Sequence, residues 1–180
     1  MLTLNQPATP GKDYLDPFDG ASGFDFTIKN VSSVPRDIRR DWYSYGSDAV
    51  HIEILAINGG VLTRPITLGR GDRAVAAASA DAQTLLPGEE STGHIPLSEL
   101  KDVDYEVSRP EDRFSANLIS PLFTGSKPHT PRKLVTAIAV FDTGPNAGAL
   151  GGKGYYRFWS GRVVSAPVTF NVWPPVTAKR

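Results

Sequence analysis

Histidine side chains are the first places to look for chemistry in this sequence. The three histidines, His51, His94 and His129, stand far apart, and the nearest approach to a metal-binding spacing is His51-x-Glu53. On a strand these two residues would face one side, but neither they nor the other histidines match a known zinc pattern. We therefore predict structural or solvent-facing roles for the histidines, and no metal site.

Three aspartates near the start of the chain raise the question of calcium. Asp13, Asp16 and Asp19 are spaced by three residues and precede Gly20. An EF-hand loop spaces its first carboxylates by two residues and closes with a glutamate, so neither condition is met. A turn-rich loop is the prediction for this segment.

Nucleophile and cofactor motifs are also missing from the sequence. There is no cysteine and no G-x-S-x-G elbow, and Ser165 stands in a predicted link between strands. The glycine pattern at residues 69–74 resembles the outline of a dinucleotide fingerprint, but no parallel βαβ pattern follows it. We predict no catalytic residues, no cofactor and no enzyme activity.

Aromatic side chains are the better candidates for binding. On a predicted strand, Tyr155, Arg157 and Trp159 share one face and would form a stacking platform for a sugar ring or a peptide. The alternative is that Trp159 packs under a neighbouring loop as part of the core. The basic and aromatic segment 36–45, which contains Trp42 and Tyr43, is either a ligand-facing loop or an aromatic plug at one end of the fold.

Alternating apolar residues predict the strands that must position these side chains. Residues 24–30 and 50–57 alternate cleanly, and Asn58-Gly-Gly60 predicts a hairpin into a partner strand over 61–68. Residues 134–141 have apolar side chains at both odd and even positions, which suits a central strand covered on both faces. In the last strand we expect Val168, Phe170 and Val172 to point inward, opposite Trp173.

A Pro-Gly turn leads to a resemblance. Thr84 to Leu97 predicts a hairpin around Pro87-Gly88. Together with Ile95-Pro-Leu-Ser98 and the segment 158–172, which contains Trp159-Ser-Gly-Arg-Val163, the motif Leu86-Pro-Gly-Glu89 resembles immunoglobulin-like β-sandwich domains of bacterial secreted and envelope proteins. Over residues 24–173, the resemblance implies an all-β antiparallel sandwich of about seven to nine strands. Residues 131–134 depart from the family pattern, which leaves the local register open.

The predicted domain organisation is a single domain with a long insertion. We expect an extended lead-in over residues 1–22, an immunoglobulin-like sandwich over 23–175 and a short tail over 176–180. Residues 99–133 are charged and irregular, and we treat them as an insertion with a short strand near 114–119.

Charge and composition limit the classes of partner. The chain has 180 residues and no net charge, but residues 1–113 carry 18 acidic and 11 basic side chains, against 1 and 8 in residues 114–180. Strands from both halves lie side by side in a sandwich, so mutual neutralisation is expected, with a homo-oligomer as an alternative. No charge block predicts nucleic-acid binding, and no apolar run predicts a transmembrane segment.

These observations favour a binding protein. The leading hypothesis is a secreted or periplasmic interaction module that binds a protein or a glycan, with a cytoplasmic location as the alternative. An inhibitor of a secreted protease, acting through the Gly-rich loop or the loop at 120–131, and a jelly-roll shell protein are the other hypotheses. Two short motifs, the Asn30-Val-Ser32 glycosylation sequon and Arg70-Gly71-Asp72, would matter only in particular extracellular settings.

Overall fold

A computed structural model describes residues 1–7, 9–39, 43–44, 47–48, 50–69, 82–97, 100–102, 132–143 and 159–173. Within these ranges the regular structure consists of β-strands in antiparallel sheets, and no α-helix occurs. The predicted all-β antiparallel class is therefore confirmed for the described part of the chain. Most of the predicted insertion at 99–133 and all of the tail at 176–180 lie outside these ranges.

The first sheet contains three strands in the order β1 (Leu2–Leu4), β2 (Gly23–Lys29) and β9 (Glu90–Pro96). The predicted alternation in β2 is confirmed, because Phe24, Phe26 and Ile28 are buried in the core. Residues 1–22, predicted as an extended lead-in, contribute β1 to this sheet.

The second sheet runs in the order β10 (Lys101–Asp102), β7 (Gly60–Gly69), β6 (Val50–Ile57) and β11 (Lys133–Thr143). Two short strands, β12 (Gly161–Val164) and β13 (Val168–Val172), pair with opposite ends of β11. Because β6 occupies the other edge of β11, β12 and β13 follow one another along a single edge. Ser165 joins them: its amide donates to Ala139 O at 3.0 Å and its hydroxyl accepts from Ala139 N at 2.9 Å.

Two sequence predictions about this sheet are confirmed. The β6–β7 hairpin turns at Asn58 and Gly59, whose φ angles of 51° and 80° are the positive values that these residue types tolerate. The β11 strand lies between β6 and the β12–β13 edge, and it is buried on both faces around Ile138 and Val140, whereas Leu134 at its start is 45% exposed. Val135 and Ala139 are buried on its core side, and Val140 is buried on the other side.

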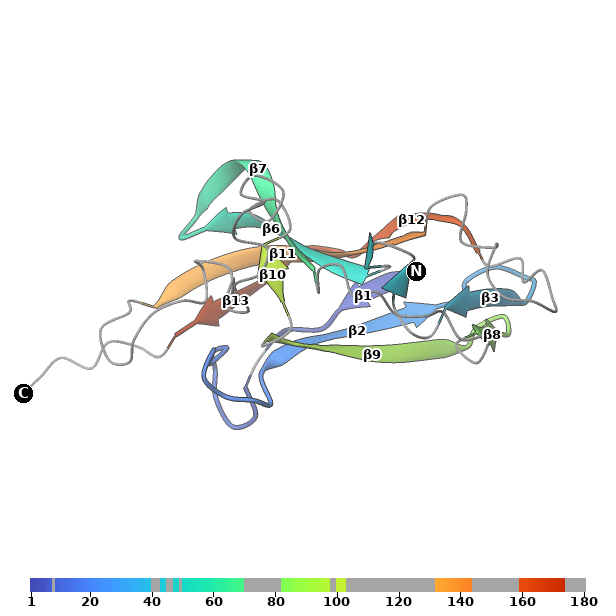
Figure 1. Ribbon diagram of the computed structural model, residues 1–180, viewed down its shortest axis with the longest axis horizontal. Helices are drawn as coiled ribbons and strands as arrows, with labels where there is room; N and C mark the ends of the chain where they lie inside the picture. The colour runs from blue at the N-terminus through green and yellow to red at the C-terminus, as the bar shows by residue number, and fades with distance from the viewer. Residues whose placement is uncertain are drawn as a thin grey trace, which may run out of the picture.

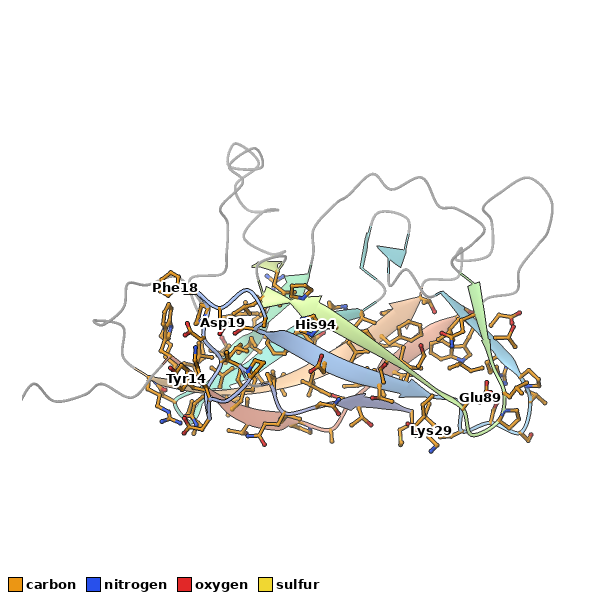
Figure 2. All side chains as sticks on the ribbon, turned by 90° about the horizontal axis from the view of Figure 1, so that it is seen from below. Tyr14, Phe18, Asp19, Lys29, Glu89 and His94 are labelled. Carbon is orange, nitrogen blue, oxygen red and sulfur yellow. The ribbon has the colours of Figure 1, made fainter. Side chains whose placement is uncertain are left out.

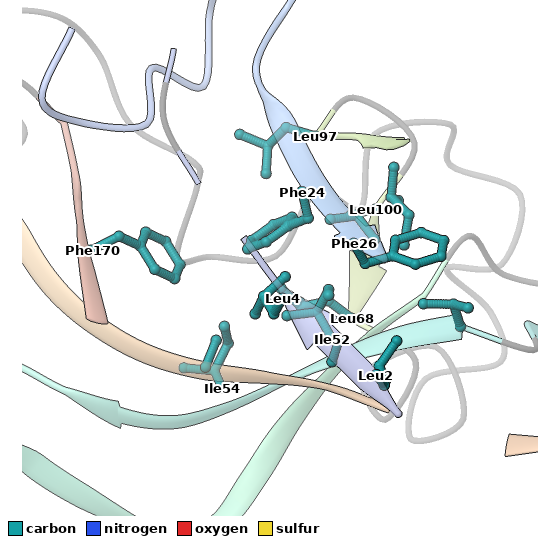
Figure 3. Packing of buried hydrophobic residues seen from close by; sticks show 14 of the residues in the cluster. Leu2, Leu4, Phe24, Phe26, Ile52, Ile54, Leu68, Leu97, Leu100 and Phe170 are labelled. Carbon is teal, nitrogen blue, oxygen red and sulfur yellow. The ribbon is translucent and has the colours of Figure 1, made fainter. Parts of the chain in front are cut away.

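The two sheets face each other across one hydrophobic core, an arrangement consistent with a β-sandwich. Figure 1 shows β2 and β9 in one layer and β6, β11 and β13 in the other. Figure 3 shows Phe24 and Phe26 from the first sheet beside Ile52, Ile54 and Phe170 from the second. Phe24 and Phe170 meet edge to face, with ring centroids 5.6 Å apart.

A pair of short strands joins the layers at one end. β3 (Arg36–Arg39) pairs with β8 (Ala82–Leu85), and the amide of Trp159, just before β12, donates to Asp37 O in β3 at 2.8 Å. Two further strands, β4 (Tyr43–Ser44) and β5 (Ser47–Asp48), pair with each other. On one side, β3 pairs with β8, which leads into β9 of the first sheet. On the other side, it accepts a hydrogen bond from Trp159, which leads into β12 of the second sheet.

This arrangement corrects the predicted hairpin over 84–97. The Pro-Gly turn is present, with Glu89 N donating to Leu86 O at 3.0 Å and Gly88 at a φ of 86°. However, β8 pairs with β3 while β9 pairs with β2, so the two strands do not form a hairpin ladder. A turn sequence sets the local reversal of the chain, whereas pairing depends on distant partners.

Trp173 also differs from its prediction. We expected it to point away from the core, yet it is fully buried. Its φ of 73° lies in the left-handed region, which ends the two-residue alternation directly after Val172. Its amide donates to Leu15 O at 3.1 Å, and Leu15 is itself completely buried. The segment before β2 and the end of β13 therefore close this end of the core together.

Gly93 in β9 provides a test of the core packing. It pairs with Phe26, whose ring lies where a Cβ on Gly93 would stand. We expect Gly93→Ala to lower the free energy of unfolding by about 1 to 3 kcal/mol, because the buried ring must move in a closed core. Urea unfolding measures this loss. Gly20→Ala is the control, since its Cβ would meet no atom within 4 Å; equal effects of the two changes would contradict the argument.

Candidate functional site

Only part of the predicted binding face can be placed. Tyr155, Arg157 and Trp42 lie outside the described residues, and for Tyr43 the structure gives the backbone in β4 but no side-chain position. Trp159 is described and half-buried. Its ring stacks on Phe141, with centroids 5.5 Å apart and planes inclined by 15°. The platform of Tyr155, Arg157 and Trp159 stays a prediction.

Trp159 is held by its backbone as well as by its ring. Its amide bonds to Asp37 in β3, and its carbonyl accepts the Thr143 hydroxyl at 2.8 Å. Gly161 lies against the ring so closely that a Cβ there would stand 3.0 Å from it. These contacts hold the indole ring between the core and the space beside it.

That space is a cavity of about 230 Å³ at the end of the sandwich where β3 and β8 join the layers. Its walls come from all three groups of strands. Leu2 and Ile28 come from the first sheet, and Ile38 and Leu85 come from β3 and β8. Phe141 and Val163 come from the second sheet, and Trp159 lies just before β12. The cavity therefore lies where the two sheets and the joining strands meet.

Polar residues at the end of β2, on the loop after it and at the start of β3 make up another part of the lining. Lys29, Asn30, Ser32 and Arg36 all line the cavity. In Figure 2, Lys29 and Glu89 lie at one end of the molecule, and Tyr14 and Phe18 lie at the other. The candidate site is thus at the opposite end from the loop formed by residues 9–22.

Asn30 is the residue that fixes this loop. Its Nδ2 donates to Val34 O at 2.8 Å and to Leu85 O at 2.9 Å, and its Oδ1 accepts from Ser32 N and Ser32 Oγ. Its backbone pairs with the Pro-Gly turn, through Glu89 O and Gly88 N. One buried side chain therefore ties together the end of β2, the loop, β8 and the turn before β9.

This geometry bears on the glycosylation sequon at Asn30. A glycan would replace one of the two Nδ2 hydrogens, and both are used in hydrogen bonds. Asn30 is only 7% exposed. The folded protein consequently uses this asparagine as a structural residue, and a glycan on it would break the loop.

Exposed apolar side chains stand near the cavity. Val31 lines it and is 68% exposed, while Val34 and Leu86 adjoin the two carbonyls that Asn30 holds and are also exposed. Exposed apolar surface next to a cavity is a candidate contact site for a partner, and Val31 belongs to both the lining and the exposed surface. The cavity and these three residues together are called the docking end below.

Two cationic side chains belong to the docking end, and the Met1 ammonium is a third cation in the cavity lining. The Lys29 ammonium already pairs with Glu90 Oε1 at 2.8 Å. Arg36 is exposed, and its Nε makes a long bond of 3.4 Å to Ser32 Oγ. Among the described residues that line the cavity there is no carboxylate, so the local charge is positive.

The two described histidines contact separate carboxylates and do not form a common centre. His94 Nδ1 lies 2.7 Å from Asp25 Oδ1 on the exposed face of the first sheet. His51 Nε2 lies 3.3 Å from Glu53 Oε1, which Arg162 also contacts at 3.0 Å. His129 lies outside the described residues. Within the described ranges, no three histidine, aspartate or glutamate side chains come together as metal ligands.

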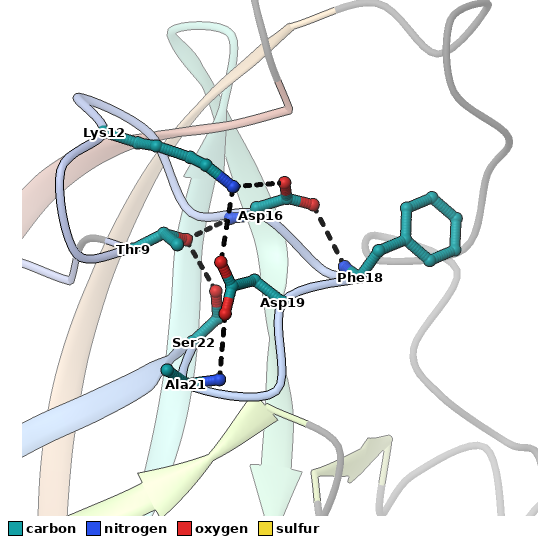
Figure 4. A network of polar contacts seen from close by, with 7 residues as sticks. All are labelled: Thr9, Lys12, Asp16, Phe18, Asp19, Ala21 and Ser22. Atoms are coloured by element: carbon teal, nitrogen blue, oxygen red, sulfur yellow. Dashed lines mark hydrogen bonds and ion pairs between the residues drawn. The ribbon is translucent and has the colours of Figure 1, made fainter.

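The aspartate-rich loop is organised by turns and by a lysine, as Figure 4 shows. Asp16 Oδ1 accepts from Phe18 N, and Asp19 Oδ1 accepts from Ala21 N, which confirms the predicted turns. The Lys12 ammonium bonds to Asp16 at 2.8 Å and to Asp19 at 3.3 Å. The hydrogen bond to Asp16 raises the pKa of Lys12, so a protein cation stands between these carboxylates.

Asp13, the third aspartate, has a separate partner. Its carboxylate accepts a hydrogen bond of 2.8 Å from Nη2 of Arg132, the residue just before β11. This hydrogen bond holds the pKa of Asp13 below its ordinary value. The bridge links the N-terminal loop to the second sheet, and it is a structural contact.

Sequence reasoning found only some of the docking end. Arg36 belonged to the segment predicted as a ligand-facing loop or a plug, and Trp159 to the predicted platform. Ile38, Leu85 and Val163 carried no functional signal, because they are ordinary apolar residues of strands. Asn30 was noticed only as a sequon, although an asparagine directly after a strand is a signal for a side chain that caps a turn.

Comparison with known proteins does not place the chain in a family. In the described part of the chain, no helix has the length and apolar character needed to cross a bilayer. No protein-family model, curated protein or solved structure matches the sequence or its fold.

Proposed function

We propose that this protein is a non-enzymatic interaction module that binds a protein partner at its docking end. The single observation that supports the proposal is the apolar cavity flanked by exposed Val31, Val34 and Leu86. The proposal includes an immunoglobulin-like topology of about seven to nine strands and a secreted or periplasmic location. Tyr155 and Arg157 would extend the contact surface beside Trp159.

The size of the cavity favours a side chain as its occupant. Sites for cofactors and drug-sized ligands have volumes of about 300 to 1,000 Å³, whereas an engineered cavity of about 150 Å³ holds one benzene molecule. A volume of about 230 Å³ lies between these cases and suits one aromatic or branched apolar group. A partner that inserts a single anchor residue would fill it, as anchor residues do in protein interfaces.

The chemistry of the walls favours a protein over a glycan. Leu2, Ile28, Ile38, Leu85 and Val163 offer no hydrogen bonds to sugar hydroxyls. Moving hydroxyl groups into such surroundings without partners costs about 1 to 3 kcal/mol each. Apart from Thr143, which ends β11, the loops that a protease inhibitor would present, 120–131 and 143–153, lie beyond the described residues, so that alternative stays a prediction.

Filling the cavity tests the proposal. Val163 lines it, and its neighbour Val164 faces the opposite side of β12 and is 44% exposed. We expect Val163→Phe to abolish partner binding while the melting temperature stays within about 3 °C of wild type, because the ring occupies existing space. Val164→Phe makes the same chemical change outside the cavity and should leave binding intact.

The measurement is a cross-linked pull-down from the source organism, using wild type and both variants as baits and mass spectrometry as the readout. A protein retained by wild type and Val164→Phe, and lost with Val163→Phe, would agree with the proposal. Retention that is equal for all three baits would exclude the cavity as the docking point.

A further inference from the structure

If the proposed function holds, the charge of the docking end predicts the charge of the partner segment that binds there. Two cationic side chains, the Met1 ammonium and no carboxylate line the cavity among the described residues. Glu90 already neutralises Lys29, and the Met1 ammonium donates to Lys29 O at 2.8 Å, so Arg36 is the cationic side chain that remains for a partner. The terminal nitrogens of Arg36 have no partner within the described part of the chain, and its Nε bond to Ser32 is long.

Arg36 has a defined position relative to the apolar walls. It stands two residues before Ile38 on β3, so both side chains are on one face of that strand. Ile38 is 4% exposed and Arg36 is exposed, so this face leads from the core out to solvent. Along a strand, two residues span about 6 to 7 Å. The apolar and cationic contact points are therefore separated by the distance between side chains i and i+2 of an extended peptide.

We propose that the docking end binds an extended polypeptide segment of the form apolar-x-acidic, with the apolar side chain in the cavity and the carboxylate on Arg36. A guanidinium binds a carboxylate through two parallel hydrogen bonds, which sets direction as well as charge. A segment with lysine in place of the acid would place two cations together at the mouth of the cavity. Discrimination between these segments is the property that the structure assigns to Arg36.

The probes are four peptides built on acetyl-Ser-Phe-Ser-Glu-Ser-amide. One is this peptide, two carry Gln or Lys in place of Glu, and one carries Ala in place of Phe. Each is titrated into the full chain at low salt, and the Trp159 indole N–H signal is followed by NMR. We expect the Glu peptide to bind about fivefold more tightly than the Gln peptide, as for a partly exposed ion pair, and the Ala peptide not to shift the signal.

Charge reversal makes the test specific. Arg36→Glu should invert the order, so that the Lys peptide binds more tightly than the Glu peptide. Arg64→Glu changes the net charge equally on β7, outside the cavity lining, and should preserve the wild-type order. Circular dichroism melting of both variants checks that they are folded.

The outcomes separate this inference from the proposed function. Equal binding of the Glu, Gln and Lys peptides, all lost with Val163→Phe, would overturn the role of Arg36 and leave the cavity as a docking point. 3-Phenylpropionate is titrated in the same way as a fifth probe. A shift from this compound, with none from any peptide, would overturn the polypeptide and point to a small carboxylate ligand. If no probe moves the Trp159 signal, the inference fails, and the pull-down with Val163→Phe decides the proposed function independently.

Discussion

Replacing Trp173 with alanine is expected to lower the free energy of unfolding by about 3 to 5 kcal/mol, as for other fully buried aromatic residues. The side chain is completely buried and meets Phe18 edge to face, with centroids 5.4 Å apart. Its removal would open a void between Leu15 and the end of β13. The free energy of unfolding of domains of this size is only about 5 to 15 kcal/mol. This loss would therefore unfold a measurable fraction of the protein at the growth temperature of its source organism.

Two other variants identify the cause of that loss. Trp173→Phe keeps an aromatic ring in the core and should cost less than half as much as Trp173→Ala. Phe18→Ala removes the partner ring, which is 59% exposed, and should cost only about 1 kcal/mol. Urea unfolding followed by far-ultraviolet circular dichroism measures all three. A loss below about 1 kcal/mol for Trp173→Ala would mean that the residue faces solvent, as the alternation in the sequence predicted.

The error at Trp173 shows where alternation fails as a guide. The two-residue period holds only while the backbone keeps extended dihedral angles. At Trp173 the φ angle turns positive, and adjacent residues Val172 and Trp173 are both buried. A tryptophan rarely has a positive φ angle, so the local sequence did not predict this conformation. The burial of Leu15, far away in sequence, provides the contact that favours it.

Strands were predictable where one residue pattern determined one face. Residues 24–30 alternate because one side of β2 is buried, and residues 134–141 have apolar side chains on both faces because β11 is buried on both faces around Ile138 and Val140. Pairing was not predictable in the same way. The Pro87-Gly88 turn has the same sequence whether β8 pairs with β9 or with β3, and the choice is made by Asn30 and by the backbone of Trp159.

The cavity could not be predicted from the sequence, because it is a relation among side chains from three groups of strands. Ile38, Leu85 and Val163 are separated by long stretches of chain, and each alone is an ordinary core residue. The cation beside it was more visible, since Arg36 begins a basic and aromatic segment. The sequence therefore indicated Arg36 as a candidate for binding, but it did not indicate the apolar residues that line the cavity.

Replacing Asn30 with alanine is the second change with a large expected effect. The variant removes the donor to the carbonyls of Val34 and Leu85 and the acceptor of the Ser32 amide, although the Ser32 hydroxyl still reaches Val34 O at 2.9 Å. Buried polar groups that lose a hydrogen bond keep their desolvation cost, so we expect the free energy of unfolding to fall by about 2 to 4 kcal/mol. Urea unfolding measures the loss. Peptide binding should weaken as well, because Asn30 holds the loop that carries Val31 and leads to Arg36.

Asn30→Asp separates hydrogen bonding from shape, since it keeps the size of the side chain. Its carboxylate would replace the Nδ2 donor and face two carbonyl oxygens, so burial and repulsion would raise its pKa in the folded state. The folded variant then binds a proton more tightly than the unfolded chain, and its stability relative to wild type should fall as the pH rises from 4 to 7. Ser32→Ala removes one hydroxyl and the sequon together, and it should cost about 1 kcal/mol at both pH values. If Asn30→Asp were as stable as wild type at pH 7, the two Nδ2 hydrogen bonds would not hold the loop, and the wall of the docking end would need another support.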